Sequence, residues 1–337
     1  MSEYENMNRH IGQVAVVVRD QQLSADFYAD VLGMDHIFGT SEFRGPDLDR
    51  VQKMDRAASS TRWLTDDREM FQLEIFEFEN PQSRPLPDNH SITNEGYNRL
   101  IIAVRSVEDT SAAALAAGGT ISALLCDEAD HNAAHALIRD PDGILLELVE
   151  ARELISGERP ARIVGLGITS LDLSTTVEDM CEGFGFTPCE DKFNHRRFWN
   201  EDGRLERMQT LQLDDMYLVA SQYQGSQPRP ADYRLGDIGI MNYAICFPDA
   251  DDFNACYQKT QSMGMKSNID PLIIEGSASV TYNNDRQGFS VEMIYMARKL
   301  WGLYGFSPPG IKDRVLNKIL NWKAKRAYRK HLGKRAA

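Results

Sequence analysis

Stretches of β-prone and helical residues alternate along the chain. Residues 11–18 form a β-branched run that predicts a strand. In residues 23–32 apolar side chains recur at helical spacing, and Gly33 stands where a helix-ending glycine belongs. Residues 70–78 predict a further strand. The pattern therefore predicts a unit made of a strand, a helix and additional strands.

The same order restarts near residue 96. A strand is predicted for residues 96–104, an alanine-rich helix for residues 107–117, and a strand pair for residues 136–151. The pair is joined by Asp-Pro-Asp-Gly at residues 140–143, a turn in which Pro presets one backbone angle and Gly accepts a positive φ. Glu147 is a single carboxylate within the apolar second strand, where burial is costly unless something binds it.

A second pair of units follows the charged, Gly- and Pro-containing stretch at residues 150–161, which we interpret as a linker. Strand patterns that match those of the first half recur at residues 163–172, 217–223, 239–247 and 280–293. Four units in two pairs are the simplest description. The expected domains are residues 10–152, residues 162–298 and a basic tail at residues 299–337.

Composition and charge narrow the class of protein. The chain has 337 residues, 42% of them hydrophobic, and a net charge of −13, which argues against nucleic-acid binding. Five cysteines without a CxxC pair favour reduced thiols, and the first ten residues lack the features of a signal peptide. We therefore expect a cytoplasmic protein.

Strand alternation places four polar side chains opposite apolar faces. Gln13 lies opposite three valines of the first strand, Glu74 opposite Leu73 and Ile75, and both Arg99 and Glu147 oppose apolar faces. If the apolar faces pack against helices, these four polar side chains face a cavity.

Several of these features together resemble the vicinal oxygen chelate superfamily, which includes glyoxalase I, methylmalonyl-CoA epimerase, extradiol dioxygenases and bleomycin resistance proteins. They are the first strand from Gln13 to Asp20, the motif from Phe27 to Gly33, Gly96-x-x-Arg99, and the 140–147 turn and strand. The resemblance implies an α+β fold of four βαβββ modules, paired into two incomplete barrels with a basic C-terminal helix added.

The resemblance also implies a site in the first pair of modules. Gln13, Glu74 and Glu147 would bind a divalent metal (Fe, Mn, Ni, Co or Zn), because amide and carboxylate oxygens suit such ions. Glu74 and Glu147 would be catalytic, one of them moving a proton next to a carbonyl that the metal polarises. Arg99 and His135 would bind the substrate, a small carbonyl or aromatic compound.

Two interpretations of this site remain open at the level of sequence. Arg99 occupies a position where the family usually has His, and Arg cannot ligate a cation. Either the other three residues hold a metal while Arg99 binds an anionic substrate group, or Arg99 neutralises Glu74 and Glu147 in a metal-free ligand-binding cavity of the resistance-protein kind. Extradiol-type ring cleavage is a further alternative, although its upstream His near Glu292 is missing.

The second pair of modules carries the equivalent positions Gly165, Val219, Asn242 and Glu292, and we expect no metal there. His195 lies in a charged stretch and is expected to be solvated. The connection at residues 43–51 is a candidate loop over the cavity mouth. Besides a small molecule, a second copy of the chain is an expected partner.

The tail follows a Gly- and Pro-containing hinge at residues 305–310 and predicts a basic helix. From Arg298 onward it has twelve Lys and Arg residues and one acid, Asp313. We expect it to dock on the acidic body, either of its own chain or of a partner, with an anionic membrane surface as the alternative. Its apolar side is expected to comprise Val315, Leu316, Ile319, Leu320, Trp322 and Tyr328.

Overall fold

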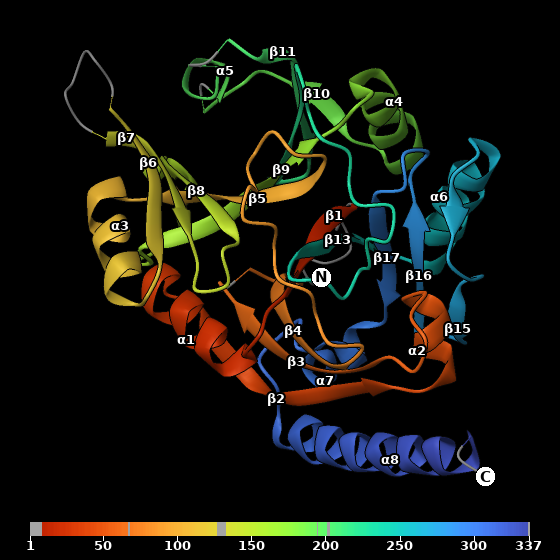
Figure 1. The fold of residues 1–337 in the computed structure, drawn as a ribbon. Helices are drawn as coiled ribbons and strands as arrows, with labels where there is room; N and C mark the ends of the chain where they lie inside the picture. Colours follow the sequence, from red (N-terminus) through yellow and green to blue (C-terminus); the bar gives the residue numbers. More distant parts are fainter. Residues whose placement is uncertain (1–8, 67, 127–132, 194, 201–202, 336–337) are drawn as a thin grey trace, which may run out of the picture.

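The computed structural model of the chain describes residues 9–66, 68–126, 133–193, 195–200 and 203–335 (Figure 1). The first unit comprises β1 His10–Val17, α1 Gln21–Leu32, β2 Asp35–Arg44, α2 Pro46–Val51, β3 Ala58–Thr65 and β4 Gln72–Asn80. The second unit comprises β5 Gly96–Val104, α3 Val107–Ala116, β6 Thr120–Cys126, β7 Ala133–Arg139 and β8 Leu145–Glu150. A single helical turn, Arg152–Leu154, follows the second unit.

The second half repeats this order. The third unit comprises β9 Ala161–Thr169, α4 Leu173–Glu178, a π-helical turn Asp179–Phe184, β10 Thr187–Cys189, α5 His195–Phe198, β11 Leu205–Leu213 and β12 Met216–Tyr223. The fourth unit comprises β13 Gly239–Phe247, α6 Ala250–Ser262, β14 Lys266–Ser267, β15 Leu272–Ile274, β16 Ala278–Asn284 and β17 Ser290–Met296. A helical turn Arg298–Leu300, α7 Trp301–Tyr304 and α8 Ile311–Arg335 end the described chain. The predicted α+β fold of four repeated modules is confirmed.

The modules pair differently from the sequence-based expectation. One sheet has nine strands, in the order β14-β16-β17-β13-β1-β4-β3-β2 with β15 beside β16, and so joins the first module to the fourth. The other has eight strands, in the order β10-β11-β12-β9-β5-β8-β7-β6, and joins the second module to the third. The prediction that successive modules pair with each other was therefore wrong. Each sheet contains strands from both expected domains, residues 10–152 and 162–298, and the division into these domains stays a prediction.

In each sheet, the two modules are joined by pairing between their first strands. β1 runs antiparallel to β13 and parallel to β4, whereas β5 runs antiparallel to β9 and parallel to β8. Val14 and Val16 on β1, like Leu73 and Ile75 on β4, belong to the main hydrophobic core, which also includes helix residues such as Phe27. The alternation predicted from sequence is confirmed, because the polar side chains of these strands are left on the other face.

The turn at residues 140–143 is ordered by its own carboxylate. Asp140 is buried and accepts hydrogen bonds from the backbone N–H groups of Asp142 and Ile144 and from the Tyr28 hydroxyl. Since Tyr28 lies on α1, this contact ties the first module to the second. Asp285 makes the equivalent backbone contacts in the fourth module, with Phe289 and Gln287 as donors.

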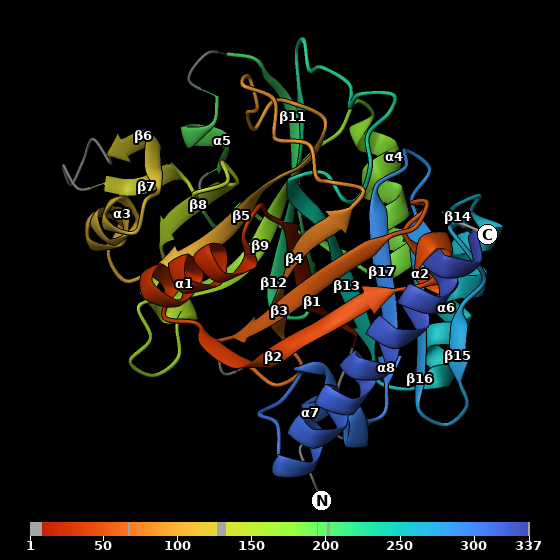
Figure 2. The ribbon, with the colours of Figure 1, turned by 60° about the horizontal axis from the view of Figure 1, so that its bottom comes forward.

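The C-terminal extension returns to the first module. The backbone N–H of Met70, before β4, donates to the carbonyl of Phe306 at 3.2 Å. Helix α8 then packs along β2 at the edge of the nine-stranded sheet (Figure 2). Within the described ranges, no helix combines the length and the apolarity needed to cross a membrane.

Candidate active site

The expected metal-ligand set is divided between the two sheets. Gln13 lies on β1 and Glu74 on β4, in the nine-stranded sheet, whereas Glu147 lies on β8 in the eight-stranded sheet. Glu147 therefore does not join the other two, and this expectation needs correction. The physical reason is the pairing of modules: each polar cluster contains residues of the modules that share its sheet.

Four oxygen-bearing side chains come together on the first and fourth modules instead. In register, Ala15 of β1 lies between Glu74 of β4 and Asn242 of β13. One step along the sheet, Ala244 of β13 lies between Gln13 of β1 and Glu292 of β17. These positions occupy four adjacent strands and the same face of the sheet. We call Gln13, Glu74, Asn242 and Glu292 the tetrad.

The tetrad is buried and only partly hydrogen-bonded. Gln13 donates its amide N–H to Glu74, and the Trp63 indole N–H donates to the other carboxylate oxygen of Glu74 at 2.9 Å. Asn242 is fully buried and its side chain interacts with the Tyr282 hydroxyl, but neither atom of its amide group makes a hydrogen bond of normal geometry with the described residues. Within the same part of the chain, one carboxylate oxygen of Glu292 also lacks a partner. Unpaired buried polar atoms are costly, so these groups favour an additional bound group.

The two carboxylates of the tetrad are poorly compensated. Burial raises the pKa of Glu74 to about 8, against the lowering effect of the Trp63 hydrogen bond. Burial, together with the negative charge of Glu74, raises the pKa of Glu292 well above its ordinary value. Glu74 therefore binds a proton near neutral pH, and Glu292 keeps its proton to a higher pH than an exposed glutamate, unless a cation replaces the protons.

A cavity of about 380 Å³ opens onto this cluster and is lined by Gln13, Glu74 and Glu292. Most of its remaining wall is apolar or aromatic. The aromatic lining residues are Phe43, Trp63, Phe76, Tyr282, Tyr295, Tyr304 and Phe306. The expected loop at residues 43–51 contains helix α2, and Asp47, Leu48 and Val51 contribute to the same wall.

The tetrad fits a divalent cation chemically. Two carboxylates and two amides supply hard oxygen ligands, and two of the residues carry orphaned polar atoms. Among the described residues no three His, Cys, Asp or Glu side chains are grouped so that they could hold a metal ion, so a metal here would need the amide oxygens of Gln13 and Asn242. The assignment of Asn242 and Glu292 to a separate second site was wrong, because they complete the cluster that begins in the first module.

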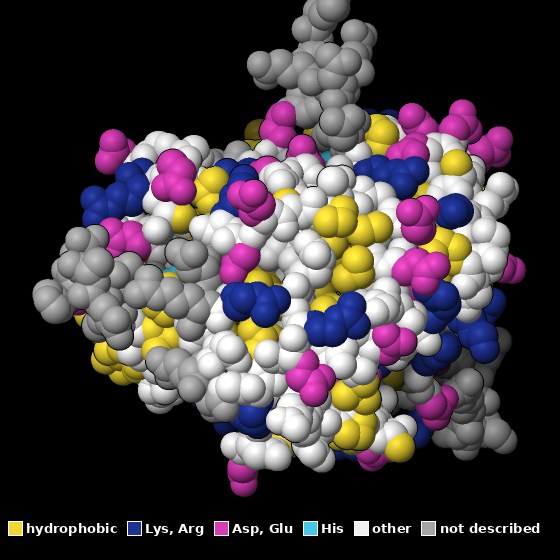
Figure 3. Space-filling model, turned by 90° about the horizontal axis from the view of Figure 1, so that it is seen from above, with side chains coloured by type: hydrophobic (Ala, Val, Ile, Leu, Met, Phe, Trp, Pro, Cys, Tyr) yellow, Lys and Arg dark blue, Asp and Glu magenta, His cyan; other side chains and the backbone are white. Residues whose placement is uncertain are grey.

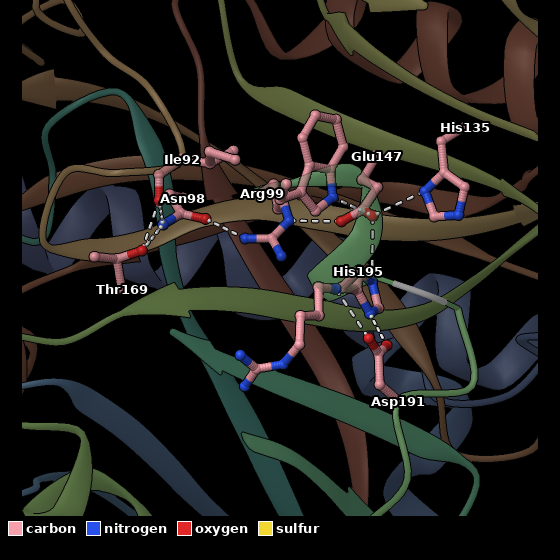
Figure 4. Close-up of polar contacts among 10 residues, drawn as sticks. Ile92, Asn98, Arg99, His135, Glu147, Thr169, Asp191 and His195 are labelled. Atoms are coloured by element: carbon pink, nitrogen blue, oxygen red, sulfur yellow. Dashed lines mark hydrogen bonds and ion pairs between the residues drawn. The ribbon is translucent and has the colours of Figure 1, made fainter. Parts of the chain in front are cut away.

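The second and third modules form a different cluster (Figure 4). The Arg99 guanidinium donates to Glu147 at 2.6 Å, and neither side chain has exposed surface. The indole N–H of Trp199 donates to Glu147 at 2.6 Å, and His135 Nδ1 lies 3.2 Å from the same carboxylate. Nε2 of His195 also lies 3.2 Å from it. We call this group the Arg99 cluster.

The charges in the Arg99 cluster compensate one another. Burial alone would raise the pKa of Glu147, but the positive charges of His195 and Arg99, and the hydrogen bond with His135, hold it well below its ordinary value. A Cβ on Gly167 would lie 2.1 Å from an Arg99 nitrogen, so only glycine leaves room for the guanidinium. Arg99 thus neutralises Glu147 alone and does not reach Glu74.

His135 and His195 are both buried and make contacts with other side chains. His195 was expected to be solvated but has no exposed side-chain surface, and its Nδ1 lies 2.8 Å from Asp191. His135 is buried and stacks on Phe198, with ring centroids 4.0 Å apart. Helix α5, which carries these partners, is anchored in this way over the eight-stranded sheet. The sequence held no periodic signal for that contact, because α5 spans only four residues.

A known family covers the first two modules. A family model described as the Glyoxalase/Bleomycin resistance protein/Dioxygenase superfamily matches residues 10–148. Among curated proteins no match was found.

Solved structures resemble most of the chain. Glyoxalase I from Zea mays is 15% identical, covers 87% of this chain and 94% of its own, and has a TM-score of 0.60. A mutant of the same Zea mays enzyme gives 15% identity, coverage of 87% and 95%, and a TM-score of 0.61. A putative dioxygenase from Bacillus subtilis is 14% identical, with coverage of 85% and 84% and a TM-score of 0.57. At such identities the likeness establishes the fold.

Proposed function

Residues 10–148 belong to the glyoxalase, bleomycin resistance protein and dioxygenase superfamily, and from that premise we propose that the chain is a metal-dependent enzyme that transfers a proton next to a carbonyl group. The observation that carries the proposal is the tetrad: two buried carboxylates and two buried amides, with Gln13, Glu74 and Glu292 lining one cavity. The substrate is a small, largely apolar carbonyl compound, and the reaction is of the isomerase or lyase kind.

The tetrad would hold the ion through Gln13, Glu74, Asn242 and Glu292. A divalent metal bound there would supply Lewis-acid polarisation of the substrate carbonyl. Trp63 keeps one oxygen of Glu74 in place through its indole N–H. Gln13 restrains the other oxygen through its amide N–H. The two glutamates are thus positioned on opposite sides of the β1–β13 strand pair before any ligand enters.

Glu74 is suited to move the proton. Burial raises its pKa to about 8, close to neutral, where a carboxyl group can both accept and return a proton. Burial also raises the pKa of Glu292, which has an oxygen without a partner among the described residues. During turnover one of these carboxylates takes the proton from the carbon beside the carbonyl and returns it to the neighbouring atom, so that no oxidant or reductant is consumed.

The cavity wall points to the substrate class. Aromatic and aliphatic side chains make up most of the lining, and they favour a substrate with an apolar or aromatic portion. The donor set favours proton transfer over oxidative ring cleavage, because non-haem iron oxygenases of the facial-triad kind use two histidines and one carboxylate. A metal-free binding protein of the resistance kind is the second candidate, favoured by the same apolar wall.

The experiment follows hydrogen exchange at carbon. The protein, incubated with Mn²⁺, Co²⁺, Ni²⁺, Zn²⁺ or Fe²⁺, is given the hemithioacetal of phenylglyoxal and a thiol in D₂O, and the product is analysed by NMR. We expect isomerisation to the hydroxy thioester, lost in Glu74→Gln and retained in Glu147→Gln. A protein that binds the compound without converting it, with every metal, would be a binding protein and would overturn the proposal.

A further inference from the structure

Helix α8 turns its polar side toward the body of the protein. Asn317 is its most buried described residue, 5% exposed, and Asn321 donates to Asn317 at 2.9 Å one turn further along. Helix α8 packs along β2, and the burial of Asn317 and partial burial of Asn321 mark this side as its inward side. The apolar side chains of α8 therefore have to lie elsewhere on the helix.

The apolar residues of α8 point away from the body. Ile311 is 84% exposed and Trp322 59% exposed, and Val315 and Ile319 between them are exposed as well. These four residues follow one another at intervals of three and four, so they form one stripe along the helix. We call Ile311, Val315, Ile319 and Trp322 the outer stripe. The tail therefore docks on the chain's own body, which was one of the two expected protein surfaces, and it does so with its polar side. The side chain of Tyr328, expected on the apolar side, lies outside the described part.

Basic residues border the outer stripe on both sides. Lys312 and Lys323 lie along one border and Arg314 and Lys318 along the other, and all four are exposed. Arg326 reaches over the Trp322 ring, with 5.4 Å between its guanidinium carbon and the ring centroid. Two further exposed leucines, Leu316 and Leu320, lie beyond Lys312 and Lys323, so α8 presents a wide apolar surface that is interrupted and bordered by positive charge.

Asp313, the single acid of α8, points to the N-terminal end of the helix. A carboxylate oxygen of Asp313 accepts the backbone N–H of Gly310 at 2.8 Å, and Asp313 is not on the outer stripe. On the face of the molecule opposite α8, acidic and basic side chains are interspersed instead (Figure 3). On α8, by contrast, Lys312, Arg314, Lys318 and Lys323 are exposed and Asp313 is the single acid of the helix sequence.

We propose that α8 binds the surface of an anionic lipid bilayer through the outer stripe. An apolar stripe with Trp and Lys or Arg margins matches the interface between acyl chains and phosphate head groups. Apolar residues enter the outer acyl region while the basic margins contact the phosphates. An acidic protein surface would pair with the basic residues but would leave four exposed apolar side chains to be covered by a matching groove.

The same helix is joined to the cavity. Tyr304 and Phe306 line the cavity at the tetrad, and α8 begins at Ile311, shortly after them in the chain. A bilayer-bound α8 is therefore separated from the cavity wall at Tyr304 and Phe306 by only a few residues of chain. This placement suits substrates that partition into membranes, although lipid binding itself does not depend on the proposed activity.

The test uses the full chain and vesicles. Sedimentation with phosphatidylcholine vesicles is compared with sedimentation when phosphatidylglycerol is mixed into them. We expect binding to the anionic vesicles, a shift of Trp emission to shorter wavelength that Trp322→Phe reduces, and a loss of binding at high salt. Ile319→Ala with Trp322→Ala should abolish binding. Leu23→Ala with Leu115→Ala, which removes two exposed leucines from α1 and α3, should leave it unchanged.

Charge is tested separately from apolar contact. Lys318→Glu and Lys323→Glu should each weaken binding to anionic vesicles roughly fivefold or more, while Lys259→Glu on α6 should have little effect. Absence of vesicle binding by the parent would overturn the proposal. A parent dimer that Ile319→Ala with Trp322→Ala converts to a monomer, without any vesicle binding, would also overturn it and identify a second copy as the occupant of the stripe.

Discussion

Glu74 on β4 and Glu292 on β17 face one cavity from the two sides of the β1–β13 pair, and the charge of Glu74 raises the pKa of Glu292. The first and fourth modules, at opposite ends of the sequence, thus supply the two acids of one site. Their mutual repulsion is relieved by protons in the free protein and would be relieved by a cation in the loaded one.

Metal binding should release protons. Because burial raises the pKa of Glu74 to about 8, and that of Glu292 also lies above its ordinary value, an incoming divalent ion has to displace protons below pH 8. We expect affinity to rise with pH, roughly tenfold per pH unit for each proton released. Calorimetric titration with Mn²⁺ or Zn²⁺ in two buffers of different ionisation enthalpy measures the number of protons. An affinity that is flat between pH 6 and about 8 would contradict this account of the tetrad.

The free energy of unfolding of the metal-free protein should fall as pH rises. A salt-bridged acid would give the opposite pH dependence. The folded-state pKa of Glu74, about 8, lies above its ordinary value of 4.5. Between these values the folded state binds more protons than the unfolded state, so the free energy of unfolding falls as pH rises through this window. The Glu74→Gln variant has no ionisable group at this position. Its free energy of unfolding should therefore fall less steeply than that of the parent between pH 5 and about 8.

Urea unfolding at several pH values, with chelator present, checks this difference. Glu275→Gln, which changes an exposed carboxylate between β15 and β16, is the matched control and should follow the parent. If Glu74→Gln and the parent had parallel pH profiles, burial would not govern the protonation of Glu74.

The Arg99 cluster should act as a structural centre. Glu147→Ala would leave the Arg99 guanidinium and the Trp199 indole N–H buried without their acceptor, and we expect a loss of about 3–5 kcal/mol in the free energy of unfolding. Arg99→Met with Glu147→Leu removes both charges and should recover much of that loss. Denaturant unfolding of the single and double variants measures the effect. A Glu147→Ala protein as stable as the parent would show that the pair is dispensable.

Much of the fold was predictable from local pattern. The strand and helix order follows from apolar periodicity, and the turn at residues 140–143 follows from Asp140 and Gly143, whose φ is +90°. Alternation also identified the polar positions of each strand, Gln13 and Glu74 among them. These features depend on neighbours in sequence, which is why the sequence alone carries them.

The partner of each module was not predictable in this way. All four modules begin with a β-prone strand, and the choice of β13 as the neighbour of β1 depends on contacts between residues more than two hundred positions apart. One chemical signal was present nevertheless. Only the combination of the first and fourth modules gives an oxygen-bearing side chain at all four positions, whereas Arg99, Gly165 and Val219 leave the other combination without a ligand set.

Elemental analysis of protein purified without chelators, and after incubation with divalent metals, tests the central claim most directly. The tetrad predicts near-stoichiometric metal in the parent, retained in Glu147→Gln and lost in both Glu74→Gln and Glu292→Gln, with circular dichroism confirming that each variant is folded. Metal that persists in Glu292→Gln but disappears in Glu147→Gln, or a parent that binds none of Mn²⁺, Fe²⁺, Co²⁺, Ni²⁺ and Zn²⁺, would contradict it.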